Sequence, residues 1–124
     1  MKKVAIALLL VSSPALAGWN LISQDDTGTA YADTAAMIRN GTLRTMWSLL
    51  DYTSFQRMVE VGYFSQKTQA EYDCKGRRVR GLVLSLHAEH MGEGKTIYLD
   101  DTPREWEAID PGSPNERLWT AACK

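Results

Sequence analysis

Hydrophobic and polar positions alternate along much of the chain, which is the pattern of β-strands that bury one face. The alternation is clearest in residues 42–50 and 77–88, and residues 61–73 form a third, mostly polar extended run. A short turn at Lys75-Gly76 separates this polar run from the strand that follows it. Two extended runs joined by a glycine turn predict a β-hairpin. Residues 51–60 show no period and are expected to be a connection, so the centre of the chain predicts an antiparallel meander.

Shorter segments add to this sheet on both sides. Residues 19–23 and 29–32 are expected to be strands that flank a turn at residues 24–28, because Asp and Gly favour chain reversal. A further strand is expected at residues 95–100, after a glycine-containing turn at residues 91–94. The whole pattern predicts an antiparallel sheet of about five or six strands.

A short helix is expected near residues 34–39. Asp33 or Thr34 can cap its N-terminus, since both residue types accept hydrogen bonds from free helical N–H groups. Asn40-Gly41 would end it, because these residues readily adopt the left-handed conformation of a helix stop.

The C-terminal residues carry a sharper helix signal. Ser113, Pro114 and Glu116 stand at the N-cap, first helical and third helical positions of a capping box. The helix is predicted over residues 114–122, with one face formed by Leu118, Trp119, Ala122 and Cys123. Because nine residues are too few to hold a helix alone, this face must pack on the sheet. The fold class is therefore expected to be α+β.

The first 17 residues have the features of a secretory signal peptide. Lys2 and Lys3 precede an apolar run over residues 4–11, and Ala15-Leu16-Ala17 supplies small residues at the cleavage site. Cleavage would leave residues 18–124 as one exported domain. Because Gly18 stands where a lipoprotein would carry cysteine, the protein is expected to be periplasmic or secreted without a lipid anchor.

Composition excludes several classes of protein. The 124-residue chain has a net charge of −1, which becomes −3 when the two N-terminal lysines are removed. A strongly basic nucleic-acid binder, a multidomain enzyme and a transmembrane protein are excluded by charge, length and the absence of a long apolar run. No catalytic or cofactor motif is present, so the protein is expected to be neither an enzyme nor a cofactor carrier.

The two cysteines, Cys74 and Cys123, are expected to form a disulfide, because an isolated pair in an oxidising compartment most often does. Two free thiols are the alternative. The bond would tether the C-terminal helix to the hairpin end of the sheet.

Two clusters of polar residues are candidate binding sites. His87 and His90 are weak metal-ligand candidates, since residues three apart face opposite sides of a strand; the alternative is two solvent-facing histidines near a turn. A second, basic cluster surrounds the hairpin turn and could contact a polyanion or a protein partner; the alternative is a solvated turn. Its members are Lys75, Arg77, Arg78 and Arg80.

The chain has four tryptophans, Trp19, Trp47, Trp106 and Trp119. Tryptophans at this density either fill the core of a small domain or form an exposed contact platform. The core is the expected location, and Trp119 on the predicted helix face fits it.

An ordered set of short features resembles the surface-adhesin protein E family of Gram-negative bacteria. The features, in chain order, are Trp19, Tyr31-Ala32-Asp33, Met37-Ile38, Gly41, Trp47, Asp51-Tyr52, Tyr63-Phe64-Ser65, Asp73-Cys74, Met91-Gly92-Glu93-Gly94, Trp106, Pro111-Gly112-Ser113 and Cys123. The resemblance implies an antiparallel sheet with a disulfide-tethered C-terminal helix. It also implies a non-enzymatic cell-envelope protein that binds host extracellular-matrix or plasma proteins. The sequence leaves open a second function, that of a periplasmic ligand-binding, metal-binding or structural envelope protein.

Overall fold

The computed structural model of the protein describes residues 18–124, and the predicted signal peptide at residues 1–17 lies outside the described residues. The described chain forms one eight-stranded antiparallel sheet, one short 3-10 turn and one α-helix. The elements are β1 (Asn20–Asp25), β2 (Gly28–Ala32), β3 (Ile38–Asn40), β4 (Leu43–Met58), β5 (Val61–Asp73), β6 (Arg78–His87), η1 (His90–Gly92), β7 (Thr96–Asp100), β8 (Glu107–Ala108) and α1 (Pro114–Cys123).

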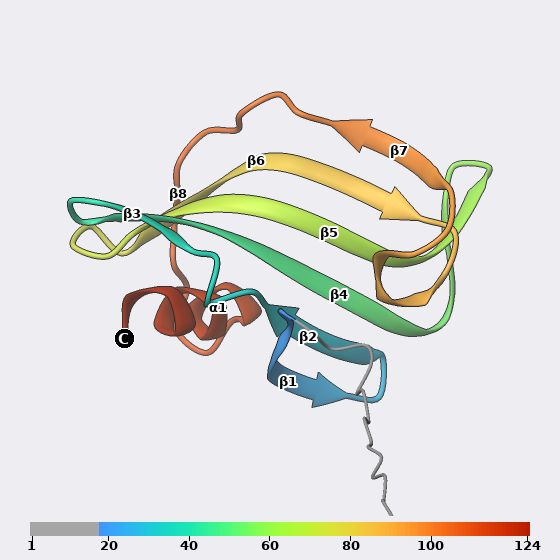
Figure 1. Ribbon diagram of the computed structural model, residues 1–124, viewed down its shortest axis with the longest axis horizontal. Helices are drawn as coiled ribbons and strands as arrows, with labels where there is room; N and C mark the ends of the chain where they lie inside the picture. Colours follow the sequence, from blue (N-terminus) through green and yellow to red (C-terminus); the bar gives the residue numbers. More distant parts are fainter. Residues whose placement is uncertain (1–17) are drawn as a thin grey trace, which may run out of the picture.

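Six strands form the continuous sheet in the order β1-β2-β4-β5-β6-β7, and the short strands β3 and β8 pair with β4 and β6. The sheet is strongly curved, and α1 lies against one of its faces near the end where β5 turns into β6 (Figure 1). This arrangement confirms the predicted α+β class and the antiparallel meander.

The connection expected at residues 51–60 is wrong, because β4 continues through this segment to Met58. A bulge explains why no period was visible in the sequence. Asp51 pairs with Ser65 and Gln56 pairs with Tyr63, so four residues of β4 stand opposite one residue of β5. Such an insertion shifts the alternation of faces and hides a strand from pattern analysis.

The helix expected near residues 34–39 is also wrong. The Asp33 carboxylate does accept a hydrogen bond from the backbone N–H of Ala36 at 3.2 Å, as a helix cap would. The chain then leaves the turn and enters β3, where Ile38 pairs with Thr45 and Asn40 with Leu43. Gly41, at φ 64°, makes the hairpin turn between these strands. Pairing with β4 satisfies the backbone of β3, whereas a helix this short would leave most of its N–H and C=O groups free.

The C-terminal helix forms as predicted. The Ser113 side chain accepts a hydrogen bond from the Glu116 N–H, and Pro114 occupies the first turn. The Glu116 carboxylate accepts a hydrogen bond from the Gly112 N–H at 2.8 Å, so the capping box closes one residue further out than expected. Neither this helix nor any other in residues 18–124 has the length and apolar content needed to cross a bilayer.

The core lies between α1 and the face of the sheet that it covers. Its buried members are Ala32, Met46, Ala70, Tyr72, Val79, Ile109, Trp119 and Ala122. The expectation that the tryptophans fill the core is correct for Trp119 alone, because Trp19, Trp47 and Trp106 are only partly buried. Tyr72 is buried at the centre of the core, and burial raises the pKa of its hydroxyl.

Candidate functional site

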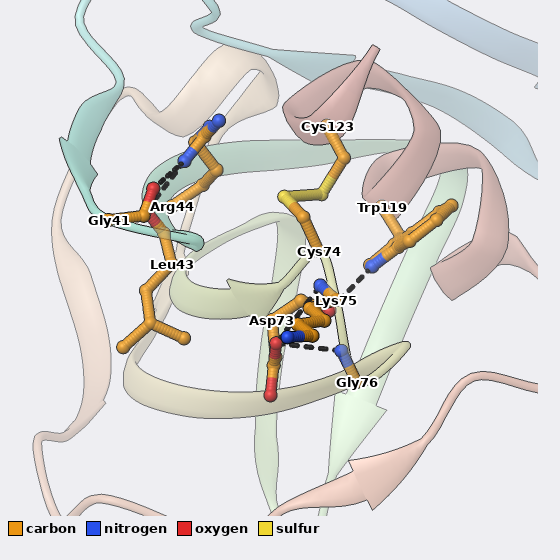
Figure 2. Close-up of a disulfide and its surroundings, with 9 residues drawn as sticks. All are labelled: Gly41, Leu43, Arg44, Asp73, Cys74, Lys75, Gly76, Trp119 and Cys123. Atoms are coloured by element: carbon orange, nitrogen blue, oxygen red, sulfur yellow. Dashed lines mark hydrogen bonds between the residues drawn. A yellow bond between two sulfur atoms is a disulfide. The ribbon is translucent and has the colours of Figure 1, made fainter.

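The end of the sheet beside α1 brings together most of the residues predicted to be functional. Cys74, just after β5, and Cys123, at the end of α1, form the predicted disulfide, with their Cα atoms 5.5 Å apart (Figure 2). Next to it, the indole N–H of Trp119 donates a hydrogen bond of 3.0 Å to the backbone carbonyl of Asp73. The helix is therefore held to the sheet by a covalent bond and by a buried hydrogen bond at neighbouring residues.

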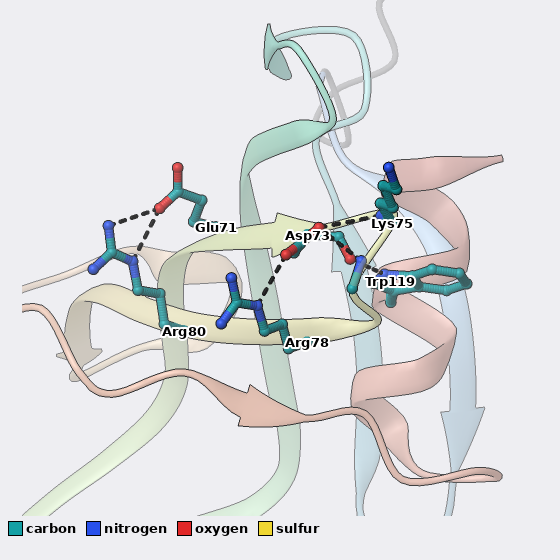
Figure 3. A network of polar contacts seen from close by, with 7 residues as sticks. Glu71, Asp73, Lys75, Arg78, Arg80 and Trp119 are labelled. Atoms are coloured by element: carbon teal, nitrogen blue, oxygen red, sulfur yellow. Dashed lines mark hydrogen bonds and ion pairs between the residues drawn. The ribbon is translucent and has the colours of Figure 1, made fainter.

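The Asp73 side chain organises the turn between β5 and β6. One carboxylate oxygen accepts the N–H groups of Lys75 and Gly76 at 3.1 and 2.8 Å (Figure 2). The other accepts the Arg78 Nε–H at 2.9 Å (Figure 3). The Gly76 N–H bond and the Arg78 side-chain bond hold the pKa of this carboxyl below its ordinary value, against the effect of burial. One carboxylate thus orders the turn, while residues 75–78 stay exposed to solvent.

On one face of β6, two arginine guanidinium groups stack on the same tryptophan indole. Arg78 and Arg80 are two residues apart on β6, so their side chains share a face. Their guanidinium carbons lie 4.5 and 4.9 Å from the centroid of the Trp106 ring. Pairing of β8 with the start of β6 brings Trp106 alongside them, since Arg78 lies opposite Ala108.

The two arginines also pair with carboxylates across the strands. Asp73 is the β5 partner of Arg78, and Glu71 is the partner of Arg80. The ion-pair distances are 2.9 Å in both cases. We call the set Glu71, Asp73, Arg78, Arg80 and Trp106 the arginine–tryptophan ladder.

The remaining members of the predicted basic cluster behave differently. Arg77 pairs with Glu116 of α1 at 2.9 Å, and its guanidinium lies 4.5 Å from the Trp119 ring centroid. Within residues 18–124, Lys75 is the cluster member without an ion pair. Three of the four positive charges are therefore compensated locally, and the surface presents half-exposed, ordered guanidinium and indole groups.

The sequence did not point to Glu71, Asp73 and Trp106 as parts of this surface. The two carboxylates could have been found by pairing the strands across the turn, because the hairpin places charges of opposite sign side by side. Trp106 carried no such signal, since the sequence pattern does not show that β8 returns to β6.

A hollow lies beside α1 on the core face of the sheet, with a cavity volume of about 230 Å³. Its floor includes Ser48, Thr68 and Ala70, and its walls include Arg104 and Leu118. A second hollow of about 100 Å³ shares Ser48 and Leu118 with the first and continues towards β2.

The two histidines have separate environments. His87 is 7 % exposed, which corrects the solvent-facing alternative for this residue; its Nε2 lies 2.8 Å from the Ser85 hydroxyl. Burial, together with the Lys67 cation, lowers the pKa of His87. His90 is half-exposed, with Nδ1 3.0 Å from an Asp51 carboxylate oxygen and its ring 4.5 Å from the ring of Phe64.

These positions do not make a recognisable catalytic or metal centre. In the described part of the chain, no three or more His, Cys, Asp or Glu side chains are grouped to hold a metal ion. The Ser85 hydroxyl beside His87 is itself buried, so a substrate would not reach it in this structure.

The fold and the disulfide define a single-sheet domain closed by a tethered C-terminal helix. The chain belongs to the surface-adhesin protein E family, whose sequence profile matches residues 19–124. No curated protein sequence matches the chain significantly.

Solved structures of protein E from Haemophilus influenzae have the same fold. One is 10% identical and superposes with a TM-score of 0.67 over 93% of this chain and 90% of that one. A second crystal form is 11% identical, with a TM-score of 0.69 over 94% and 96% of the two chains. Protein E from a non-typeable strain gives a TM-score of 0.62 at 11% identity, over 92% and 78%. This similarity confirms the predicted architecture.

Proposed function

We propose that the protein is an exported, non-enzymatic cell-envelope protein that binds host extracellular-matrix or plasma proteins. The observation that carries the proposal is the match to the surface-adhesin protein E family over residues 19–124. The disulfide supports export, because such bonds form and persist in oxidising compartments.

The arginine–tryptophan ladder is the contact surface that we assign to this function. Arginine and tryptophan are among the residue types enriched in the side chains that dominate protein–protein binding energy. Here the stacking of Arg78 and Arg80 on Trp106 orders the side chains before a partner arrives, which reduces the entropy lost on binding. The compensated charges suit a protein partner with mixed polar groups.

A binding assay with purified vitronectin and laminin tests the proposal. Wild-type protein should bind at least one of them, and Trp106→Ala should weaken binding at least tenfold without changing the net charge, as expected for a residue that dominates an interface. Arg78→Ala/Arg80→Ala should have a similar effect. The control is Arg39→Ala/Arg117→Ala, which removes the same charge from two exposed positions outside the ladder.

Thermal unfolding of each variant separates lost contacts from lost folding. The absence of wild-type binding to either host protein would contradict the adhesive function. Equal binding by wild type and the folded ladder variants would contradict the assigned surface while leaving the function in place.

Contact of Lys75, Arg77, Arg78 and Arg80 with a polyanion stays a separate prediction. Retention on a heparin column that disappears in the Arg77→Ala/Arg78→Ala/Arg80→Ala variant would support it. Because three of these charges are paired with carboxylates, we expect any retention to be weak and to end at moderate salt.

The place of the protein in the cell decides whether direct adhesion can occur. Protease added to intact cells should degrade a surface-exposed protein, and secreted protein should be found in the medium. A wholly periplasmic protein protected from protease would contradict direct adhesion and favour a role inside the envelope.

The hollow beside α1 supports a second candidate function, the binding of a small ligand. Its volume of about 230 Å³ suits a molecule smaller than most drugs. Native mass spectrometry of protein purified from its own envelope would detect such a ligand. Leu118→Trp, which would fill the hollow, should prevent its retention.

A further inference from the structure

The β4–β5 hairpin extends beyond the rest of the sheet. Pairing of β5 with β6 begins at Ser65, whereas β4 and β5 remain paired out to Met58 and Val61. Residues 55–62, which we call the hairpin apex, therefore have no third strand beside them. In Figure 1 the apex is the light-green loop at the right-hand end of the long strands.

The apex exposes apolar side chains to solvent. Val59 is 84 % exposed and Phe55 is 54 % exposed, and Met58 and Val61 are partly buried beside them. The Phe55 ring covers Gly62, where a Cβ atom would collide with it, and packs edge-on against Phe64 at 5.3 Å between centroids. These contacts fix the position of the Phe55 ring at the end of the hairpin.

The turn itself indicates that an exposed apolar residue is required there. Val59 has φ 55°, in the left-handed region that β-branched residues rarely adopt. Glycine would adopt this conformation without steric strain. A solvent-exposed valine at such a position gains nothing from packing within the protein, so its side chain is best explained by an external contact.

Behind the apex lies a layer of amphipathic aromatic rings. Tyr52 and Tyr63 pack edge-to-face at 5.8 Å between centroids, and the Tyr52 hydroxyl donates a hydrogen bond to the Gln66 side chain. Tyrosine is enriched at membrane–water interfaces, where the ring is apolar and the hydroxyl hydrated. Tyr63 follows Val59 by four positions, across the turn residue Glu60 and the first two residues of β5, so it lies at most about 13 Å behind the tip at about 3.3 Å per residue. That spacing lets the tip enter the acyl boundary, about 5–10 Å deep, while the tyrosines stay near the headgroups.

Charge and size both favour a lipid surface over a protein partner. The apex contains Arg57 and Glu60 as its only charged residues, so its net charge is zero, and the Arg57 guanidinium lies 5.9 Å from the Phe55 ring centroid. A convex tip of this size cannot bury the roughly 800 Å² per partner typical of a specific protein interface. A bilayer requires no complementary shape, and the long Arg57 side chain can reach the headgroups.

We propose that the hairpin apex inserts into the interfacial region of a lipid bilayer, with Val59 and Phe55 as the inserted side chains. The insertion is hydrophobic, so it depends little on anionic lipid. It holds the domain on a membrane by a contact separate from the arginine–tryptophan ladder and independent of the proposed adhesive function.

Flotation with phosphatidylcholine vesicles tests the proposal, with every protein carrying the same N-terminus. Wild-type protein should float with the vesicles, and Val59→Asp should lower the vesicle-bound fraction at least tenfold. Val59→Gly removes the side chain while relieving the turn, so it should bind several-fold more weakly and unfold at an unchanged or higher temperature. Leu99→Asp is the matched control, because Leu99 is 60 % exposed on β7 and away from the apex, and it should bind like wild type.

Lipid composition and salt complete the test. Binding should be unchanged by 0.5 M NaCl and by replacing a quarter of the lipid with phosphatidylglycerol. The proposal is overturned by the absence of flotation at millimolar lipid, by equal flotation of wild type and Val59→Asp, by an equal loss in Leu99→Asp, or by binding that salt abolishes.

Discussion

The indole N–H of Trp119 in α1 bonds to the backbone carbonyl of Asp73 at 3.0 Å, one residue before the disulfide-bonded Cys74. The helix and the sheet are therefore joined twice at one place. Because both partners of the hydrogen bond are buried, the carbonyl has no water to replace the indole. The tertiary position of α1 depends on this pair as well as on the disulfide.

Replacement of Trp119 by Phe should destabilise the protein by about 1–3 kcal/mol, mainly because a buried carbonyl loses its donor. Trp119→Ala should cost more, about 3–5 kcal/mol, because it also leaves a cavity. Urea unfolding with the disulfide intact measures both. A loss below about 0.5 kcal/mol in Trp119→Phe would contradict the role of the hydrogen bond.

Removal of the disulfide by Cys74→Ser/Cys123→Ser should lower the free energy of unfolding by up to about 4 kcal/mol, the chain-entropy value for a loop of this length. The cysteines are 49 residues apart, so the bond constrains a large part of the unfolded chain. Denaturant unfolding of the variant and of reduced wild type should agree. A loss below about 0.5 kcal/mol would mean that the core alone holds α1 in place.

Acid should remove the contribution of Asp73 to stability. Its pKa is lowered in the folded state, so the unfolded carboxyl takes up a proton first as the pH falls. The stabilisation is complete above the ordinary value of about 3.8 and is lost as the pH falls through the lower folded value. Asp73→Asn should therefore cost about 1–2 kcal/mol at pH 7, since its charged partner Arg78 is half-exposed. The difference from wild type should shrink as the pH falls below the ordinary value of 3.8, as measured by urea unfolding across pH.

His87 should contribute to acid sensitivity in a higher pH range. Burial lowers its pKa below the ordinary value of 6.5, so between the folded value and 6.5 the unfolded state binds more protons. Stability should fall as the pH drops through this window, and His87→Gln should flatten that part of the profile. The Lys67 charge adds to the shift, and Glu93 opposes it. An NMR titration in which His87 keeps a pKa of 6.5 or more would contradict the prediction.

Two strand glycines should respond differently to alanine. A Cβ atom at Gly28 would collide with the backbone carbonyl of Asp51, which cannot move without displacing β4. A Cβ atom at Gly81 would meet only the Arg104 side chain, at an ordinary distance of 3.6 Å. Gly28→Ala should cost about 1–3 kcal/mol, and Gly81→Ala should be neutral or slightly stabilising. Thermal unfolding of the two variants side by side tests this contrast.

Elements with strong local signals could be predicted from the sequence. The capping box at Ser113 and Glu116 needs only four consecutive residues, so α1 was located correctly. The strands around Lys75-Gly76 were visible because one of their faces is buried and the other is not. The chemistry of the two cysteines was sufficient to predict the disulfide.

Elements that depend on distant partners could not be predicted in the same way. Residues 34–39 have a genuine cap at Asp33, yet pairing with β4 makes Ile38–Asn40 a strand. The bulge after Asp51 concealed the extension of β4, and with it the exposed hairpin apex. Trp106 joins Arg78 and Arg80 because β8 returns to β6.

The sequence by itself determined the α+β class, the central meander, the C-terminal helix and the cysteine pair, because each follows from contacts within a short stretch or from the chemistry of a residue type. Tertiary structure alone decided which tryptophan is buried, which arginines share an indole, and where apolar side chains remain exposed. These outcomes depend on strand register and on the placement of α1 over one face. Register joins residues far apart in the chain, and no local pattern records that pairing.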